Sequence, residues 1–310
     1  MKTKLWCALI ALYIVWGSTY LAIRFAVETI PPFLHAAVRF LISGSILFIW
    51  RRAAGDPKPT SGNWKAAAIV GTFLLVGGNG LVAVAEQNIP SGIAALIIAT
   101  SPFWLVLFES FRAGGTKPSW QSILGLVVGF GGVFLLIGPA GITGAPQRFN
   151  TTSVVLLVIA PVLWSLGSIY AKGADMPRST LMSTGMQMLT GGVSLLVVSA
   201  ATGELGGFSL AEVSMRSWWG LLYLVTFGSL IGFVSYGWLL HNAPISLVST
   251  YAYVNPVVAV FLGWLLAGET LNARMAVASA IIVGSVVFIT YARRIPARNG
   301  AVEVVPQEIE

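Results

Sequence analysis

Long apolar runs alternate with short polar or charged segments along almost the whole chain. A helix needs about 20 mostly apolar residues to cross the hydrocarbon core of a bilayer. With charged residues and Pro/Gly clusters taken as boundaries, the pattern predicts ten membrane-spanning helices, at 5–27, 33–50, 65–85, 91–111, 119–138, 152–172, 179–201, 217–239, 245–266 and 273–292. The predicted fold class is an all-α integral membrane protein.

Composition supports the same interpretation. The chain is 56% hydrophobic and 9% charged, with a mean hydropathy of +0.83, whereas about a quarter of the residues of a soluble domain are charged. The net charge of +7 would suit nucleic acid, but the basic residues lie between apolar runs and are not interleaved with aromatic residues that stack on bases. We therefore expect the lipid bilayer, and not nucleic acid, as the partner of the basic residues.

Lysine and arginine are unequally shared between the two sets of polar segments. An amino terminus in the cytoplasm places most of them on the cytoplasmic side and leaves Arg148, Arg216 and Arg274 on the other. Because basic residues concentrate in cytoplasmic loops, we predict a multi-pass protein of the cytoplasmic (inner) membrane with both termini in the cytoplasm.

The proline and glycine positions of the chain repeat. One set of pairs lies 154 positions apart and another 148 apart: Asn88/Asn242, Pro90/Pro244, Pro102/Pro256, Gly114/Gly268 and Thr116/Thr270, and then Trp16/Trp164, Leu41/Leu189 and Gly44/Gly192. Such repeats indicate a duplicated fold. Each half has five helices, an odd number, so the halves must cross the membrane in opposite senses, as in many secondary transporters. The predicted units are residues 1–148, residues 149–293 and a short cytoplasmic tail, 294–310.

Several motifs occur in the same order in both halves and resemble the EamA family of the drug/metabolite transporter superfamily. They are the run Ala85 to Leu96, Pro102 and the glycines from Gly125 to Gly132, then Asn255-Pro256, Gly268-Glu269-Thr270 and Gly284, and near the start Trp16 to Tyr20 and Arg39-Phe40. The resemblance covers Leu5 to Tyr291. It implies a ten-helix basket with a central cavity, in a family usually assigned to the export of amino acids, other metabolites or drugs. One departure is visible, because Gly115 stands where the second half has Glu269.

Little in the sequence supports enzyme chemistry. The single cysteine, Cys7, excludes an internal disulfide, and with only His35 and His241 beside it there is no metal-ligand cluster. Glu86 and Glu109 are the only acids that approach the interior of a span, and they belong to no paired carboxylate or nucleophile–base set. We expect no enzyme activity, no metal and no cofactor.

Two helix faces carry residues suited to the wall of a cavity. Trp16 and Tyr20 lie one turn apart on the first helix, and the matching positions on the sixth helix are Trp164 and Ser168. Rings offer apolar or cation–π contact and hydroxyls orient a ligand. The alternative is that the tryptophans pack between helices or lie in the interfacial belt.

Two further candidates lie inside predicted spans. Arg39 is costly there and is a functional candidate by default; it either contacts substrate or forms an ion pair with Glu28 or Glu86. Asn79 lies among the glycines of 77–80, where a weakened helix exposes carbonyls to a ligand. The alternative is that these glycines only permit close helix packing.

The eighth and ninth helices add Tyr236, Tyr251 and Asn255 as substrate-binding candidates. Proline in a helix frees a carbonyl about one turn earlier and can serve as a hinge. The matched residues Pro102 and Pro256 therefore suit gating by local bending, with a static kink as the alternative.

Small residues form stripes in two helices, at Gly125–Gly129 and at Ala276, Ala280 and Gly284. Such stripes bring helices close together. They pack within the chain, or else they form a homodimer.

Together these features predict a secondary transporter, an exporter of small organic metabolites such as amino acids or drug-like solutes, that works by alternating access. A passive channel is the second candidate and a membrane-embedded enzyme the third. Proton-coupled carriers usually hold a titratable group in the membrane, so transport is either uncoupled or coupled through Glu86.

Overall fold

The computed structural model describes residues 2–111, 120–137, 149–242 and 251–292, and all regular structure in these ranges is helical. The elements of the first half are α1 (Lys2–Ala26), α2 (Pro32–Ala53), α3 (Ser61–Gly71), η1 (Thr72–Gly80), α4 (Leu81–Glu86), α5 (Ser91–Ile98), α6 (Ser101–Phe111) and α7 (Trp120–Ile137). Those of the second half are α9 (Thr151–Ala171), α10 (Thr180–Ala201), η2 (Leu210–Glu212), α11 (Met215–Tyr223), η3 (Leu224–Ile231), α12 (Gly232–Asn242), α14 (Tyr251–Ala267) and α15 (Ala273–Ala292). The repeat partners Gly114, Thr116 and Pro244, as well as Gly115, Arg148 and the tail 294–310, lie outside the described residues.

Seven helical stretches in the described part of the chain are long and apolar enough to cross a membrane, and three shorter apolar helices accompany them. The helix ends lie close to those that the sequence predicts. The two halves differ within their fourth and ninth helices. The fourth breaks into α5 and α6 just before Pro102, whereas Pro256 lies inside a continuous α14. The all-helical membrane fold class is confirmed.

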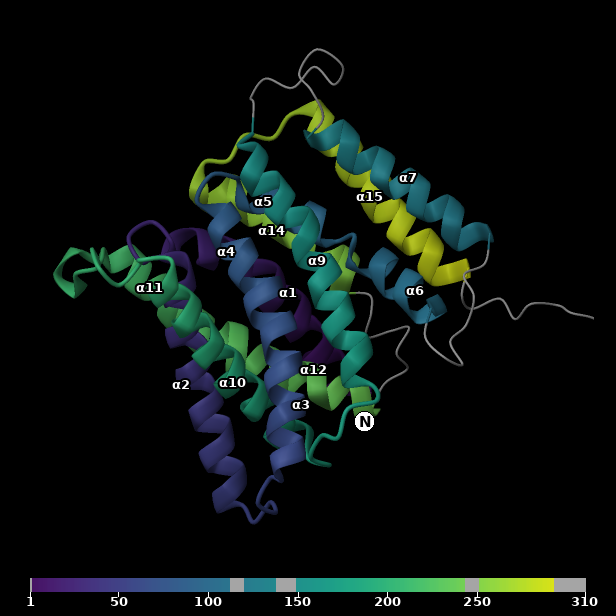
Figure 1. Ribbon diagram of the computed structural model, residues 1–310. Coiled ribbons are helices and arrows are strands. Elements are labelled where there is room, and N and C mark those ends of the chain that lie inside the picture. The colour runs from purple at the N-terminus through teal and green to yellow at the C-terminus, as the bar shows by residue number, and fades with distance from the viewer. Residues whose placement is uncertain (1, 112–119, 138–148, 243–250, 293–310) are drawn as a thin grey trace, which may run out of the picture.

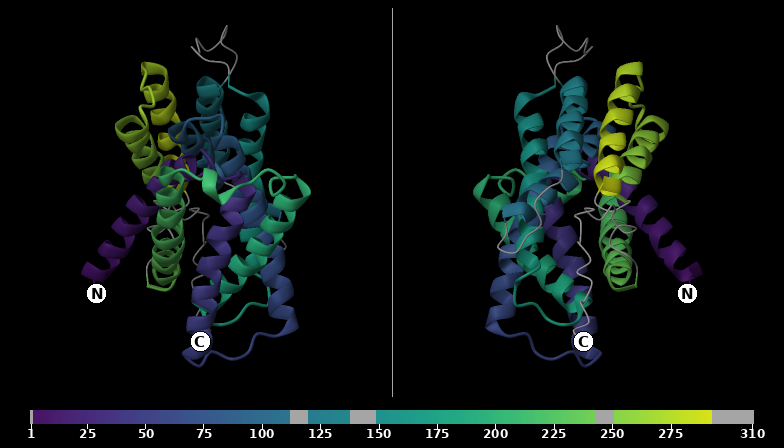
Figure 2. Two further views of the ribbon diagram at one scale, coloured as in Figure 1. Left: turned by 90° about the vertical axis from the view of Figure 1, so that its left-hand side faces the viewer. Right: turned by 90° about the vertical axis from the view of Figure 1, so that its right-hand side faces the viewer.

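Helices of the two halves pack against one another (Figure 1). α2 runs along α10, and α7 runs along α15. α1 packs on α14 and α12, while α9 packs on α6 and η1. Figure 2 shows that the start of α1 and the α2–α3 turn lie toward the same end of the molecule.

The α2–α10 contact is centred on two glycines. A Cβ atom on Gly44 would lie 2.9 Å from Leu189 N, and one on Gly192 would lie 3.1 Å from Leu41 N. The sequence pairs Gly44 with Gly192 and Leu41 with Leu189 at a spacing of 148. Each glycine therefore contacts the equivalent leucine of the opposite half. Without side chains at these two points the backbones approach closely, as small residues allow in membrane helices.

Both ends of this helix pair are closed by a carboxylate. Glu204 accepts hydrogen bonds from Phe33 N (3.2 Å) and Leu34 N (2.9 Å) in the first turn of α2, where free backbone N–H groups favour an anion. Asp56, which lies 148 positions earlier, is hydrogen-bonded by Arg51 and by Ser179, the N-cap residue of α10. The Arg51 guanidinium holds the pKa of Asp56 below its usual value.

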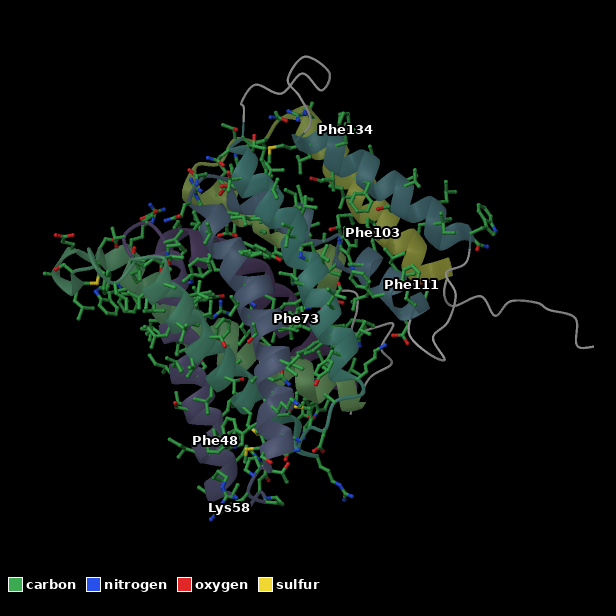
Figure 3. The ribbon with its side chains drawn as sticks, viewed as in Figure 1. Phe48, Lys58, Phe73, Phe103, Phe111 and Phe134 are labelled. Atoms are coloured by element: carbon green, nitrogen blue, oxygen red, sulfur yellow. The ribbon has the colours of Figure 1, made fainter. Side chains whose placement is uncertain are left out.

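The α7–α15 pair is joined by small residues and by one arginine. A Cβ on Gly132 would lie 2.9 Å from Ile281 and Ile282 side chains, and Arg274 donates to the Leu135 and Leu136 carbonyls at the end of α7. The predicted stripe of Ala276, Ala280 and Gly284 is exposed and does not form this contact. Figure 3 places Phe134 of α7 at the opposite end of the molecule from Phe48 and Lys58, which lie near the α2–α3 turn.

Candidate functional site

The third and eighth helices both widen into a π-helical segment near their centres. η1 and η3 each begin and end in helical backbone, so the chain passes through a wider turn without breaking. π-helical turns offset the hydrogen-bond ladder and occur frequently at functional sites. Four candidate residues of the sequence lie in or against these two segments: Trp16, Arg39, Asn79 and Trp164.

Trp16 of α1 lies against η3. Its indole Nε1 donates to Gly228 O at 3.3 Å, and a Cβ atom on Gly232 would collide with the same nitrogen. Three aromatic rings surround the indole with centroids 5.1–5.3 Å away: Phe233, Tyr236 and Tyr251. Trp16 therefore extends from α1 toward the eighth and ninth helices, where it contacts the candidates Tyr236 and Tyr251.

Trp164 of α9 has the reciprocal position against η1. A Cβ on Gly78 would lie 2.8 Å from Trp164 Cε3, and Gly78 is the repeat partner of Gly232. The hydrogen bond differs, because Asn79 Nδ2 donates to Leu74 O at 3.3 Å, within the same segment. The repeat partner of Asn79 is Phe233, which has no donor, so η3 receives its donor from Trp16.

Two other candidate side chains, Ser168 and Tyr20, make contacts of different kinds. Ser168 Oγ donates to Trp164 O at 2.7 Å, one turn earlier on α9. Tyr20 is partly buried against the apolar cluster that contains Ile23 and Ala83. Ser168 and Asn79 thus bond within their own helices, whereas Tyr20 packs against apolar side chains.

Arg39 is 3% exposed and meets η3 one residue beyond the Trp16 acceptor. Its Nε donates to Ser229 Oγ at 2.9 Å, and its Cζ lies 4.7 Å from the Phe40 ring centroid. The predicted alternative partner Glu28 pairs with Arg216 instead, at 3.0 Å. Within the described residues no ion pair includes Arg39, so the ion-pair alternative finds no support.

Asn255 is buried on α14 beside α1. In the amide orientation that faces donor to acceptor, its side-chain nitrogen donates to Tyr251 O and Tyr13 O, both at 3.2 Å. A Cβ on the nearby Gly17 would lie 2.6 Å from Val258 Cβ. Asn255 thus joins α14 to α1 directly before Pro256.

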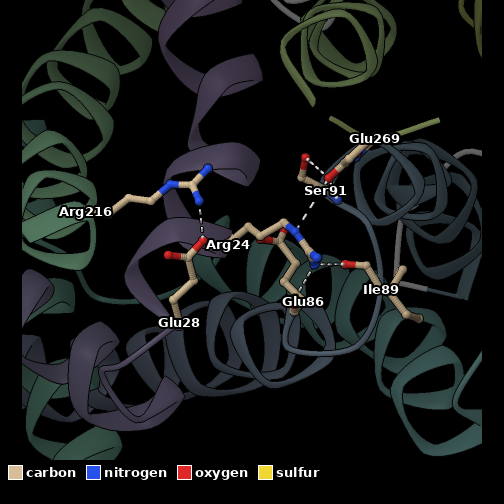
Figure 4. A network of polar contacts seen from close by, with 8 residues as sticks. Arg24, Glu28, Glu86, Ile89, Ser91, Arg216 and Glu269 are labelled. Carbon is tan, nitrogen blue, oxygen red and sulfur yellow. Dashed lines mark hydrogen bonds and ion pairs between the residues drawn. The ribbon is translucent and has the colours of Figure 1, made fainter. Parts of the chain in front are cut away.

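A network of polar contacts surrounds the start of α5 (Figure 4). Glu269 accepts from Ser91 N (2.7 Å), Ser91 Oγ (2.8 Å) and Gly92 N (3.1 Å), and so caps the first turn of α5. Arg24 Nε lies 3.8 Å from Glu269, and its Nη1 donates to the backbone carbonyls of Glu86 and Ile89. A glutamate of the second half therefore holds a helix of the first.

Glu86 lies inside this network with its carboxyl group unpaired. Its exposed fraction is 0%, and neither carboxyl oxygen has a hydrogen-bond partner among the described residues. Burial of a charged carboxylate without donors is costly.

A smaller contact occupies the end of α9. Lys172, the repeat partner of Arg24, pairs with Glu109 of α6 at 2.8 Å. Arg24 and Lys172 therefore each have an acidic partner in the other half of the chain.

Four contacts of this region were absent from the sequence-based prediction: those of Gly228, Ser229, Gly232 and Glu269. Gly232 could have been found as the repeat partner of Gly78, and Glu269 was noticed only as unmatched. Ser229 carries no signal, because its repeat partner is Leu75.

Known proteins resemble the chain over most of its length. The model of the EamA-like transporter family matches residues 3–138 and again 151–291. The chain is 39% identical to the uncharacterized inner membrane transporter YedA of Escherichia coli strain K12, covering 91% of this chain and 89% of that one. It is 23% identical to the uncharacterized transporter YoaV of Bacillus subtilis strain 168, covering 90% and 94%. A solved crystal structure with 20% identity covers 94% of this chain and 98% of its own, with a TM-score of 0.64, which shows a shared fold.

Proposed function

Because the chain belongs to the EamA-like transporter family, we propose that it is a secondary transporter that moves small organic metabolites across the cytoplasmic membrane by alternating access. Its relatives are named as transporters, which points away from an enzyme. Export of amino acids or drug-like solutes remains the specific form of the proposal.

The ten-helix inverted repeat is part of this proposal. Reciprocal contacts support it: Trp16 lies on Gly232 while Trp164 lies on Gly78, and Gly44 and Gly192 exchange equivalent neighbours. The family model also matches once in each half. A two-fold relation between halves of opposite sense is the arrangement that places a binding site between them near the bilayer midplane.

The convergence of Trp16 and Arg39 on consecutive residues of η3 is the observation that carries the site. Gly228 accepts from the indole and Ser229 accepts from the guanidinium, so an aromatic cluster and a buried cation adjoin the same π-helical segment. Apolar rings with a few placed polar groups are typical of small-molecule sites. Tyr20, Asn79, Trp164, Ser168, Tyr236, Tyr251 and Asn255 complete the proposed substrate-binding set.

Alternating access requires movable elements at both ends of the site. The break before Pro102 and the proline within α14 supply flexible points in the two proposed gating helices. The Arg24–Glu269 and Lys172–Glu109 pairs join helices at equivalent positions of opposite halves. We assign these two contacts to the closed forms of the outer and inner gates.

Coupling to protons through Glu86 is the second part of the mechanism. The enclosed carboxyl group has no hydrogen-bond donor among the described residues, and a bound proton removes the cost of an uncompensated charge there. The basic residues Arg51, Arg52, Lys58 and Lys65 lie in and beside the α2–α3 turn. Figure 2 shows this turn toward the same end of the molecule as the start of α1, which supports the proposed cytoplasmic placement of the amino terminus.

Exchange in proteoliposomes tests the proposed function. Vesicles containing the purified protein and loaded with a metabolite mixture should take up a labelled component of that mixture faster than unloaded vesicles, because a carrier returns faster when it is occupied. Saturable, exchange-stimulated uptake is expected. Flux that grows linearly with concentration and ignores internal solute would identify a channel instead.

A further inference from the structure

Arg39 has more hydrogen-bond donors than the protein uses. A guanidinium carries five N–H groups, and the only hydrogen bond of its side chain to a described residue is the one from Nε to Ser229. Arg39 is 3% exposed, so its guanidinium is buried with four N–H groups that have no hydrogen-bond partner among the described residues.

In the part of the chain that the structure describes, no acidic side chain forms an ion pair with the guanidinium. Around it lie the Phe40 ring, the backbone at Gly228 and the methyl group of Thr19, and a Cβ on Gly228 would lie 3.1 Å from Nη2 and 3.0 Å from Thr19 Cγ2. Glu28, a partner expected from the sequence, is paired with Arg216 at 3.0 Å. A cation held within a membrane span without an anion is costly, and such residues pair or mark a ligand path.

The Ser229 contact also fixes the direction of the guanidinium. With Nε engaged, the edge formed by Nη1 and Nη2 is the one left free, and two parallel N–H groups match the two oxygens of a carboxylate. One fixed charge favours a singly charged anion. The adjoining rings of Trp16 and Phe233 offer an apolar surface for the body of the same molecule.

We propose that Arg39 is the receptor for the carboxylate of the transported solute. The substrates are then organic monocarboxylates with an apolar body, and they do not need a positively charged amino group. This rests on the proposed transport function and narrows its substrate class. Ser229 is the positioning residue that orients the guanidinium.

Binding to the purified protein in nanodiscs tests the assignment directly. The probes are butyrate, hexanoate and benzoate, each beside its neutral amide, with benzylammonium as the cationic counterpart of benzoate. At least one acid should raise the unfolding temperature of the wild type, and its amide should not. Arg39→Gln should weaken binding of that acid by about ten- to hundredfold, because a hydrogen-bonded charge pair is lost.

Three variants separate a specific receptor from a general loss of charge. Arg39→Lys keeps the charge without the paired donors and should bind the acid more weakly than wild type. Ser229→Ala keeps the guanidinium but frees its orientation, and should weaken the acid less than Arg39→Gln does. Arg216→Gln removes an equal charge from a surface ion pair and should leave acid binding unchanged. Size-exclusion profiles identify any variant that has not folded.

The outcomes against the proposal are equally definite. It is overturned when no acid of the panel stabilises the wild type, when an amide or benzylammonium binds as well as the acid, or when Arg39→Gln binds the acid normally. Transport is scored separately by counterflow. Exchange of neutral or cationic solutes that survives Arg39→Gln keeps the transporter and removes the carboxylate receptor, whereas specific acid binding without exchange keeps the receptor and removes the transporter.

Discussion

Trp16 and Gly232 come from opposite halves of the chain, and the indole nitrogen of one occupies the space that a side chain on the other would fill. The same relation joins Trp164 to Gly78, where an added Cβ would lie 2.8 Å from the ring. Each tryptophan thus reaches the π-helical region of the other half. This exchange fixes the first and sixth helices against the eighth and third.

Gly232→Ala should therefore displace Trp16 and lower both stability and flux. Overpacking costs about 1–3 kcal/mol, and the collision involves a rigid ring that already donates to Gly228. Thermal unfolding in detergent and exchange in vesicles are the measurements. Gly284→Ala is the matched control, because nothing lies within 4 Å of a Cβ there. If the two variants lose the same stability and flux, the close Trp16–Gly232 contact is not what makes Gly232 necessary.

Glu269→Gln should destabilise the region around the start of α5. The substitution removes the charge that accepts from two N–H groups at the start of α5 and that pairs with Arg24. Loss of a helix cap costs about 0.5–2 kcal/mol. Glu28→Gln, which opens a half-exposed surface pair with Arg216, should cost less than about 1 kcal/mol. An unfolding temperature that falls as far for Glu28→Gln as for Glu269→Gln contradicts the assignment of the cap.

Glu86→Gln should abolish any effect of a pH gradient on transport while exchange continues. The neutral amide cannot carry a proton, yet it has nearly the size of the carboxyl group that is enclosed there. Uptake into vesicles with and without an imposed gradient is the measurement, and Glu28→Gln is the control, since Glu28 lies in a half-exposed surface pair with Arg216. Gradient-driven accumulation that persists in Glu86→Gln would show that Glu86 is not the coupling group.

The sequence identifies residues at the contacts between the two halves, because few residue types fit where helix backbones approach closely. The spacing of the repeat pairs Gly44 with Gly192 and Trp16 with Trp164, and the structure gives these residues reciprocal contacts. The role of Ser229 could not be predicted, because the repeat partner, Leu75, is apolar. The π-helical segments were also missed, since a wider turn in an apolar run leaves the hydrophobic pattern unchanged. Features that differ between the halves are hidden from reasoning based on the repeat.

One such difference is the donor for the carbonyl freed in each π-helical segment. Leu74 O takes its donor from Asn79, whereas Gly228 O takes its donor from Trp16 because Phe233 stands at the position equivalent to Asn79. Trp16→Phe should remove that donor and lower the stability, by about 0.6–1.7 kcal/mol for a hydrogen bond between membrane helices. In a Trp16→Phe background, Phe233→Asn should restore a local donor in the manner of Asn79.

The double variant should therefore lose less stability than the two single losses added together, which is the signature of direct coupling. Phe227→Asn in the same background is the control, because Phe227 is 43% exposed on the same helix and its change should be additive. Size-exclusion chromatography after heating measures the loss of stability of each variant without relying on tryptophan fluorescence. If Phe233→Asn and Phe227→Asn are both additive with Trp16→Phe, then the Gly228 carbonyl does not depend on a donor from residue 16 or residue 233. The explanation of the difference between the two π-helical segments then fails.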